Sequence, residues 1–422
     1  MLISSHLDHR GRHRVAITGL GVMSPAGNDL ATFWSRLNSG ESCAKRIERF
    51  DPSELTVQIG CEVPDFDVSA YVTPKEARRL DRVSILGFAA AADALADANA
   101  HGTPIEADPS RCGIIAGVGI GGLITLEEQI GVMIEKGPNR VSPFLVPMMM
   151  TNATPALVSL QFGWTGPNIA VATACAAGTN AIGDAANLIR YGESDVAIGM
   201  GAESCMTPVA ISAFGRMTAL SGRTDDPSRA SRPFDEGRDG FVMGEGAGAL
   251  ILERWDLAVA RGARIYGEIV GYGRNSDSHH ITAPSPGGAG AAACIELALQ
   301  DAAIAANAIG HVNAHGTSTP LNDAAEAEAV TKVFGPRAVP VTSTKGITGH
   351  LIGAAGAVEA VAAVLSMAKQ QVPPTANLDQ VDPAFELDVV AGATRAIPSA
   401  CALSNSFGFG GHNASLIVSP AQ

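Results

Sequence analysis

The segment Val171-Ala172-Thr173-Ala174-Cys175-Ala176-Ala177-Gly178 joins an apolar, strand-like run to an Ala-rich helical pattern. A strand that leads directly into a helix is the repeating unit of an α/β fold. Cys175 lies at this junction, where the free N–H groups and the dipole of a helix N-terminus favour the thiolate, the nucleophilic form. A free cysteine is also commonly a small buried hydrophobe, so this segment alone leaves both interpretations open.

The alternation of strands and helices extends outward in both directions. Apolar runs that predict strands lie at residues 14–19, 111–117, 168–173, 195–201, 246–252, 265–272, 310–314, 339–342, 400–405 and 414–418. Helical patterns lie at residues 29–38, 73–99, 175–191, 289–305, 323–334 and 351–369. The sequence therefore predicts an α/β fold with a mostly parallel sheet. The order strand–helix–strand occurs in both halves, although no repeat is visible by residue identity.

The composition excludes several classes of protein. The chain has 422 residues, 47 of them glycine, and only 5% aromatic residues, which indicates closely packed elements with many tight turns. A formal net charge of -13 argues against nucleic acid as the main partner. Seven cysteines without a C-x-x-C pair fit a reducing compartment such as the cytoplasm. No charge-free apolar run reaches ~18 residues, so no membrane span is expected. Residues 1–14 are expected to be a flexible tail and not a secretory signal.

Two later segments change the interpretation of Cys175. His315 follows an apolar strand in the loop His311-Val312-Asn313-Ala314-His315-Gly316-Thr317-Ser318-Thr319-Pro320. Lys345 and His350 lie in the segment from Ser343 to Gly356, just before an Ala/Gly-rich helix. Each histidine alone is more often a hydrogen-bonded loop or core residue. One cysteine and two histidines, each at the end of a strand or helix, form a more specific constellation for nucleophilic catalysis.

The motifs that surround these residues resemble a known family. They are Thr173-Ala174-Cys175-Ala176-Ala177-Gly178, Arg232-Pro233-Phe234-Asp235 with Arg238-Asp239-Gly240-Phe241, Asn313-Ala314-His315-Gly316-Thr317, Lys345 to Gly356, and Asn405-Ser406-Phe407-Gly408-Phe409-Gly410-Gly411. From about Arg14 to the C-terminus the sequence resembles the type II β-ketoacyl-[acyl-carrier-protein] synthases, condensing enzymes of the thiolase superfamily. The resemblance implies a thiolase-like fold with two pseudo-duplicated βαβ halves in an α-β-α-β-α arrangement. Residues 15–262 would carry the nucleophile and residues 263–422 both histidines.

The resemblance also implies a role for each motif residue. Cys175 would take the acyl group from acyl-carrier protein, and His315 and His350 would stabilise the enolate formed when malonyl-carrier protein loses CO2. Lys345 would orient the site electrostatically. The N–H groups of Cys175 and Phe409 would form the oxyanion hole. The product would be a 3-oxoacyl-carrier protein of fatty acid elongation, and neither a metal nor an organic cofactor would be required.

Further residues are assigned by the same resemblance. The flexible glycines Gly408 and Gly410, the pocket residues Ile120 and Phe214, and the pantetheine-binding hydroxyls Thr317 and Thr319 would contact substrate. A basic cluster expected on one helix, at Lys75, Arg78, Arg79 and Arg82, would dock the acidic carrier protein, although a solvated helix face would look the same. A structural cation could lie near Asn313, Glu359 and Asn405, with Ser404; Glu359 could equally be a buried carboxylate near Lys345.

Several alternatives stay open at this point. A ketosynthase of a polyketide or other specialised pathway would use the same chemistry. A non-catalytic chain-length subunit would lack the nucleophile, whereas Cys175 is present. A degradative thiolase would need a second catalytic cysteine in the glycine loop near the C-terminus, and Cys401 lies outside that loop. The match Gly117-x-Gly119-x-x-Gly122 follows a strand and spells a dinucleotide-binding fingerprint, but a lone match is weak. The resemblance further implies a homodimer in which the strand entering Cys175 pairs across the two-fold axis.

Overall fold

Eleven strands form the central sheet of the computed structural model, which describes residues 6–421. Their order is β12-β10-β9-β14-β15-β8-β1-β7-β6-β4-β5. The bounds are β1 Val15–Met23, β4 Cys112–Gly117, β5 Asn168–Val171, β6 Val196–Glu203, β7 Gly246–Arg254, β8 Gly267–Ser276, β9 Ile309–Asn313, β10 Pro340–Thr342, β12 Asp388–Val389, β14 Cys401–Gly408 and β15 His412–Ser419. The α/β fold is confirmed, and every run predicted as a strand contributes to this sheet.

The expectation of a mostly parallel sheet is wrong, because half of the strand pairs are antiparallel. The strands β14 and β15, for example, are joined only by the short turn 409–411, and such a turn permits antiparallel pairing alone. The pairing does repeat: β1-β7-β6-β4-β5 and β8-β15-β14-β9-β10 both run antiparallel, antiparallel, parallel, parallel. This shared pattern is the duplication that residue identity did not reveal.

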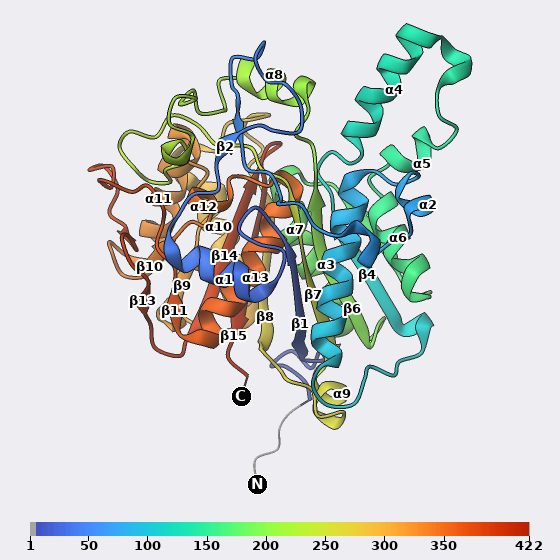
Figure 1. Cartoon of the computed structure of the whole chain (residues 1–422). Helices are drawn as coiled ribbons and strands as arrows, with labels where there is room; N and C mark the ends of the chain where they lie inside the picture. The colour runs from blue at the N-terminus through green and yellow to red at the C-terminus, as the bar shows by residue number, and fades with distance from the viewer. Residues whose placement is uncertain (1–5, 422) are drawn as a thin grey trace.

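Five helices complete the layers of the core: α3 Arg82–Asn99, α7 Ala177–Arg190, α10 Ala289–Ala302, α11 Pro320–Phe334 and α13 Ala355–Lys369. Helix α3 packs on β1, β7 and β6, while α10 packs on β8 and β15 with α11 beside it. Helices α7 and α13 contact each other and strands of both repeats, so they lie between the two halves of the sheet (Figure 1). The expected α-β-α-β-α arrangement of a thiolase-like fold is therefore present.

Small residues allow these layers to approach closely. A Cβ added at Gly21 of β1 would lie 2.0 Å from the carbonyl oxygen of Ala90 on α3. A Cβ at Gly117, where β4 ends, would lie 2.2 Å from the backbone of Ala177 at the start of α7. The abundance of Gly and Ala is thus a requirement of the helix–sheet spacing.

The residues 352–369 form the one helical stretch within residues 6–421 that is long and apolar enough to cross a membrane. It contains α13, and 89% of the stretch is buried inside the protein. Since α13 packs between the two halves of the sheet, it is accounted for as a core helix.

Two local expectations differ from the structure. The helix predicted over residues 73–99 is two helices, α2 (Pro74–Ala77) and α3, because Asp81 accepts a hydrogen bond from the N–H of Val83 and begins a new helix. Residues 6–14, expected to lie in a flexible tail, form a turn against the body of the protein, where Arg12 Nη1 lies 2.9 Å from Asp301 Oδ1. The remainder of that tail lies outside the described residues.

The other helices and short strands connect or flank these layers. They are α1 Leu30–Ser39, α4 Leu123–Lys136, α5 Leu145–Met149, α6 Ala153–Phe162, α8 Pro208–Arg216, α9 Trp255–Ala260 and α12 Lys345–Thr348, with the 3-10 turns η4 Ala174–Ala176 and η8 Ile352–Ala354 and the short strands β2 Lys45–Arg46, β3 Ile59–Gly60, β11 Gln371–Val372 and β13 Arg395–Ala396. Helix α4 projects from the body (Figure 1).

Candidate active site

A strained turn presents Cys175. Between β5 and α7 the chain passes through η4, where Ala174 adopts φ +50°, a left-handed conformation that costs energy for a residue other than glycine. The end of β14 lies directly against this turn. A Cβ at Gly408 would lie 2.8 Å from the carbonyl oxygen of Thr173 and 3.1 Å from the nitrogen of Cys175. Only glycine at position 408 lets the two segments approach in this way.

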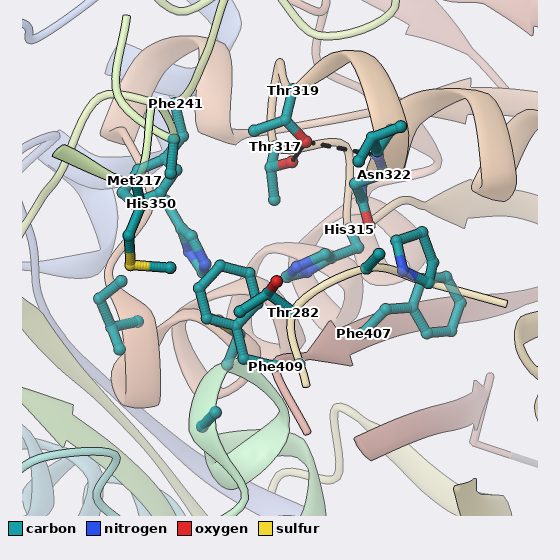
Figure 2. Close-up of a pocket in the computed structure, with 18 of the residues that line it drawn as sticks. Met217, Phe241, Thr282, His315, Thr317, Thr319, Asn322, His350, Phe407 and Phe409 are labelled. Atoms are coloured by element: carbon teal, nitrogen blue, oxygen red, sulfur yellow. Dashed lines mark hydrogen bonds between the residues drawn. The ribbon is translucent and has the colours of Figure 1, made fainter. Parts of the chain in front are cut away.

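The structure brings together the three side chains that the sequence singled out. Cys175, His315 and His350 line one cavity of about 410 Å³, and Figure 2 shows the two histidines in it. The Cys175 sulfur and one ring nitrogen from each histidine all lie within 4.8 Å of one another. The two imidazole rings are 5.3 Å apart, nearly perpendicular, and all three side chains are buried. Segments distant in sequence therefore meet in one pocket.

The protonation of these groups differs in part from the expectation. Burial raises the pKa of Cys175 to about 11, although Lys345 and the N–H groups of Phe409 and of Cys175 itself act in the opposite direction. The thiolate expected from a helix N-terminus is therefore not the resting form, because desolvation of the sulfur outweighs the backbone donors. Burial, reinforced by Lys345, lowers the pKa of His315 and of His350, so both rings are neutral near pH 7.

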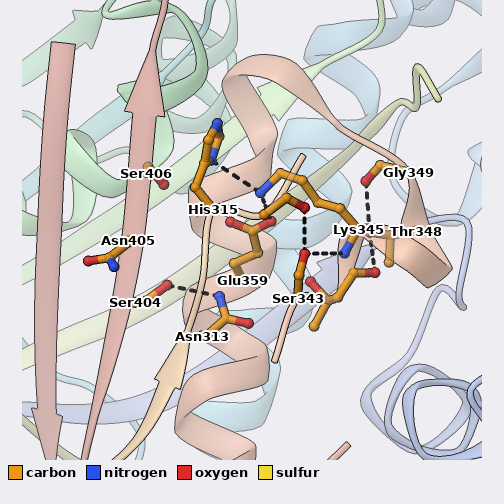
Figure 3. A network of polar contacts seen from close by, with 12 residues as sticks. Asn313, His315, Ser343, Lys345, Thr348, Gly349, Glu359, Ser404, Asn405 and Ser406 are labelled. Atoms are coloured by element: carbon orange, nitrogen blue, oxygen red, sulfur yellow. Dashed lines mark hydrogen bonds and ion pairs between the residues drawn. The ribbon is translucent and has the colours of Figure 1, made fainter. Parts of the chain in front are cut away.

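Lys345 connects His315 to a buried carboxylate (Figure 3). Its Nζ lies 3.3 Å from His315 Nδ1 and forms an ion pair with Glu359 Oε1. Burial raises the pKa of Glu359 to about 7, and Lys345 partly offsets this rise. An ammonium group can only donate hydrogen bonds, so it holds the His315 tautomer that carries its proton on Nε2. The interpretation of Glu359 as a buried carboxylate near Lys345 is confirmed.

Sequence reasoning missed a second carboxylate at this site. Glu326 of α11 accepts hydrogen bonds from the N–H groups of His315 (2.8 Å) and Gly316 (2.7 Å), and from Asn405 Nδ2 (3.3 Å). Burial raises the pKa of Glu326 to about 7, while the backbone donors lower it. The Ala-rich helical pattern around Glu326 did not indicate a site residue, because its role depends on hydrogen bonds to a loop outside that helix.

Aromatic rings form one wall of the cavity. Phe409 lies 6.4 Å from Phe214, Phe214 lies 5.6 Å from Phe241, and Phe241 lies 5.3 Å from the ring of His350. Ile120 also lines the cavity, together with Phe409 and Phe214, as expected. Phe241 is a wall residue that the sequence interpretation did not assign.

The glycine loop and the two threonines lie at the same cavity, with one exception. Gly408 lines it, whereas Gly410 does not and instead donates its N–H to the carbonyl oxygen of Ile281 at 2.7 Å, with φ +83°. The hydroxyl groups of Thr317 and Thr319 are 2.9 Å apart and both residues line the cavity. Thr319 is also the N-cap residue of α11, so its hydroxyl has a structural role in addition to its position at the cavity.

The four basic residues expected on one helix face are divided by the break between α2 and α3. Lys75, Arg78 and Arg79 are exposed. Arg82 is not available in the same way, because its guanidinium donates to both oxygens of the buried Glu245 at 2.8 and 2.9 Å. The expectation of a shared face is therefore wrong for Arg82, and the exposed cluster is limited to the other three residues.

The oxygens near the expected cation are partly paired. Asn313 Nδ2 donates to Ser404 Oγ at 3.2 Å, and Asn405 Oδ1 accepts from Ser415 Oγ at 2.8 Å. In the described part of the chain, Asn313 Oδ1 and Glu359 Oε2 are buried without a hydrogen-bond partner. These two atoms are the type of oxygen ligand that a hard cation takes, and a cation between them stays a prediction.

The glycine fingerprint at residues 117–122 has another use. The N–H groups of Gly119, Ile120 and Gly121 donate to the carboxylate of Glu203 at 2.9, 3.1 and 3.2 Å. A dinucleotide site would need such N–H groups for a pyrophosphate. They are occupied by an acidic side chain, so the nucleotide interpretation loses its physical basis.

Comparisons with known proteins find relatives that span nearly the whole chain. Residues 12–258 match the family model of the β-ketoacyl synthase N-terminal domain, and residues 266–379 match that of the C-terminal domain. A 3-oxoacyl-[acyl-carrier-protein] synthase 2 of Synechocystis sp. is 47% identical over 97% of this chain and 99% of that protein. A protein of the same name from Vibrio harveyi is 44% identical over 96% of this chain and 98% of that protein.

Solved structures show the same similarity. A β-ketoacyl synthase from Burkholderia phymatum has a TM-score of 0.90 and 38% identity, covering 97% of this chain and all of that one. A ketosynthase of a type II polyketide synthase, solved with its acyl-carrier protein and bound to a hexaketide, has a TM-score of 0.88 and 31% identity over the same shares. The chain belongs to the β-ketoacyl synthase family.

Proposed function

We propose that this protein is a 3-oxoacyl-[acyl-carrier-protein] synthase that condenses an acyl-carrier protein with malonyl-carrier protein, releasing CO2, in fatty acid elongation. The observation that carries the proposal is the convergence of one thiol and two neutral imidazoles within 4.8 Å. The names of the relatives that match nearly the whole chain support the same reaction. The cavity volume of about 410 Å³ lies in the range of small-molecule sites.

In the first half-reaction Cys175 attacks the carbonyl carbon of the acyl thioester. A bond forms between its sulfur and the acyl carbon, the bond to the carrier thiol breaks, and the departing thiol takes the proton of Cys175. Lys345 and the N–H groups of Cys175 and Phe409 all favour negative charge on this sulfur. The same two N–H groups serve the developing oxyanion, which is the group that preorganised donors stabilise most effectively.

In the second half-reaction the malonyl group loses CO2. The electron pair left by the broken C–C bond forms an enolate, and its oxygen accepts hydrogen bonds from His315 and His350. Since both rings are neutral, each has one N–H to donate, and the contact of Lys345 with His315 Nδ1 leaves that proton on Nε2. The enolate carbon then attacks the acyl carbon, the bond from that carbon to the Cys175 sulfur breaks, and the sulfur leaves as a thiolate that takes a proton from solvent to return to the resting thiol. Loss of CO2 generates the nucleophile, so the proposal requires no organic cofactor or catalytic metal.

The remaining assignments complete the proposal. Thr317 and Thr319 bind the pantetheine arm, Ile120, Phe214 and Phe409 line the acyl pocket, and the glycine loop moves to admit substrate. We further propose that the carboxylate-rich surface of the carrier protein docks on Lys75, Arg78 and Arg79. A solved relative that binds its acyl-carrier protein supports a partner of this class.

We also propose a homodimer in the cytoplasm, formed along β5. This strand is at the edge of the sheet, and Ile169 on it is 49% exposed. The projecting helix α4 exposes Ile130, Met133 and Ile134. An unpaired strand edge and exposed apolar side chains each favour contact with a second copy. A change of Ile134 to Glu should then shift the molar mass measured by light scattering from dimer to monomer.

The decisive experiment is intact-protein mass spectrometry after incubation with an acyl-carrier-protein thioester. The expected mass gain is one acyl group on Cys175, absent in Cys175→Ala and retained in the control Cys401→Ala. Retention of full condensing activity by Cys175→Ala would contradict the proposal. With malonyl-carrier protein and no reductase, a fatty acid enzyme should add one malonyl-derived unit, whereas repeated addition would favour the polyketide alternative suggested by the hexaketide-bound neighbour.

A further inference from the structure

A buried carboxylate that takes no part in the proposed chemistry lies behind the wall of the cavity. Glu203, the last residue of β6, is fully buried. Its Oε2 accepts hydrogen bonds from the N–H groups of Gly119 (2.9 Å), Ile120 (3.1 Å) and Gly353 (3.3 Å), and its Oε1 accepts from Gly121 (3.2 Å). The four donors come from two backbone segments that are far apart in sequence.

The two backbone segments fit around this carboxylate with no spare room. A Cβ at Gly119 would lie 2.6 Å from Glu203 Oε2. A Cβ at Gly353 would lie 2.8 Å from the same oxygen and 2.3 Å from the nitrogen of Gly119. Both positions therefore require glycine, and the carboxylate of Glu203 holds the two segments together at a fixed spacing.

Both segments carry cavity-lining side chains. Ile120, at the turn 119–121, and Ile352, in η8, line the cavity that contains Cys175. Ile352 adopts φ +47°, a left-handed conformation that must be held by its surroundings, and the next residue donates its N–H to Glu203. The position of this wall thus depends on the hydrogen bonds of one buried side chain.

We infer that Glu203 is a positioning residue that sets the acyl chain length accepted by Cys175, because it fixes how far Ile120 and Ile352 extend into the cavity. This inference rests on the proposed function, since it presumes that an acyl chain fills that cavity. Burial raises the pKa of Glu203 to about 7 against the pull of the four N–H groups, so the carboxylate is a costly connector. An apolar side chain at position 203 would leave the four N–H groups buried without an acceptor, so it is the carboxylate that keeps the two segments in place.

Two substitutions separate positioning from simple stability. Glu203→Gln keeps the size of the side chain, but its amide offers one acceptor oxygen and turns an NH2 group toward backbone donors. Glu203→Asp keeps the charge and shortens the side chain by one methylene, which draws the turn 119–121 toward β6 and deepens the cavity. The matched control is Glu253→Gln, an equally buried carboxylate on β7 that binds Thr18 and Arg261.

The test is a competition between hexanoyl- and lauroyl-carrier protein for wild type and each variant. The adduct ratio on Cys175, read by intact mass, gives the ratio of kcat/KM for the two chains. We expect this ratio to change about tenfold or more in both Glu203 variants, toward lauroyl for Glu203→Asp. The control Glu253→Gln should keep the wild-type ratio even if its melting temperature falls.

The experiment distinguishes failure of this inference from failure of the proposed function. Equal slowing of both chains in the Glu203 variants, or an unchanged ratio, would overturn the inference while leaving the condensing activity intact. If Glu203→Gln fails to fold, Glu203→Asp decides the question alone. Absence of any acyl adduct on wild-type Cys175 would instead contradict the proposed function itself.

Discussion

Replacing Lys345 by Met should slow decarboxylation more than acyl transfer. Met has a similar length but no donor, so His315 Nδ1 loses its partner and the ring is free to adopt the tautomer without a proton on Nε2. A hydrogen bond to a charged group contributes about 1.5–3 kcal/mol. At 3.3 Å the Lys345–His315 contact is longer than the usual range of about 2.7–3.2 Å for an N–H hydrogen bond, which favours the lower end of that free-energy range.

A loss of about 1.5 kcal/mol corresponds to about a tenfold decrease in rate. The assay follows CO2 released from malonyl-carrier protein by pre-acylated enzyme, with the initial acylation of Cys175 measured separately by mass spectrometry. Removal of Lys345 also leaves Glu359 without its cation, so the double variant Lys345→Met/Glu359→Gln controls for an uncompensated buried charge. The exposed Lys332→Met is the surface control.

The reasoning would be refuted if CO2 release by Lys345→Met matched wild type. It would also be refuted if both half-reactions fell by the same factor in the single and double variants, because that pattern indicates general disruption and not a tautomer effect on His315.

Two further predictions concern stability and docking. Burial lowers the pKa of His311 to about 3, and neither of its ring nitrogens has a hydrogen-bond partner within residues 6–421. The contribution of His311 to the free energy of unfolding is therefore fully present above the ordinary pKa of 6.5 and is lost as the pH drops toward 3, by up to about 1.4 kcal/mol per pH unit. His311→Phe should reduce this decrease of the free energy of unfolding at acidic pH, measured by urea titration. An unchanged decrease would contradict the prediction. Arg78→Ala should raise KM for carrier-protein substrates and weaken the salt dependence of KM. Arg82→Ala should mainly lower the melting temperature, because the buried Glu245 would keep only one of its two guanidinium partners, that of Arg49; a reversal of these two effects would contradict the docking assignment.

Ten of the eleven strands of the central sheet were predictable from sequence for a physical reason, and the exception is the two-residue edge strand β12. Strands buried between helix layers form nearly continuous apolar runs, and every such run is a strand in the structure. Their directions were not predictable, because apolar runs carry no information about pairing. The break before α3 did have a local signal, since Asp81 is a favoured N-cap residue that the Ala-rich pattern concealed.

Some residues of the candidate site were likewise predictable from sequence, and others were not. Cys175, His315 and His350 lie in distinctive motifs at element ends, and the structure brings them together. Glu203 and Glu326 act through hydrogen bonds to backbone groups of remote turns, so their contacts depend on tertiary packing that no spacing encodes. Likewise, the preference of Cys175 for the neutral thiol follows from its burial, which a helix-dipole argument from sequence does not include.

The high pKa of Cys175 has a consequence for how the enzyme meets reactive molecules. Only thiolates are readily alkylated or oxidised, so the resting sulfur should be sluggish toward iodoacetamide or peroxide. A more electrophilic reactive group would then do little to increase the rate at which a covalent inhibitor modifies Cys175. Such inhibitors would gain from mimicking the bound acyl group, whose carbonyl reaches the backbone donors that make the sulfur reactive.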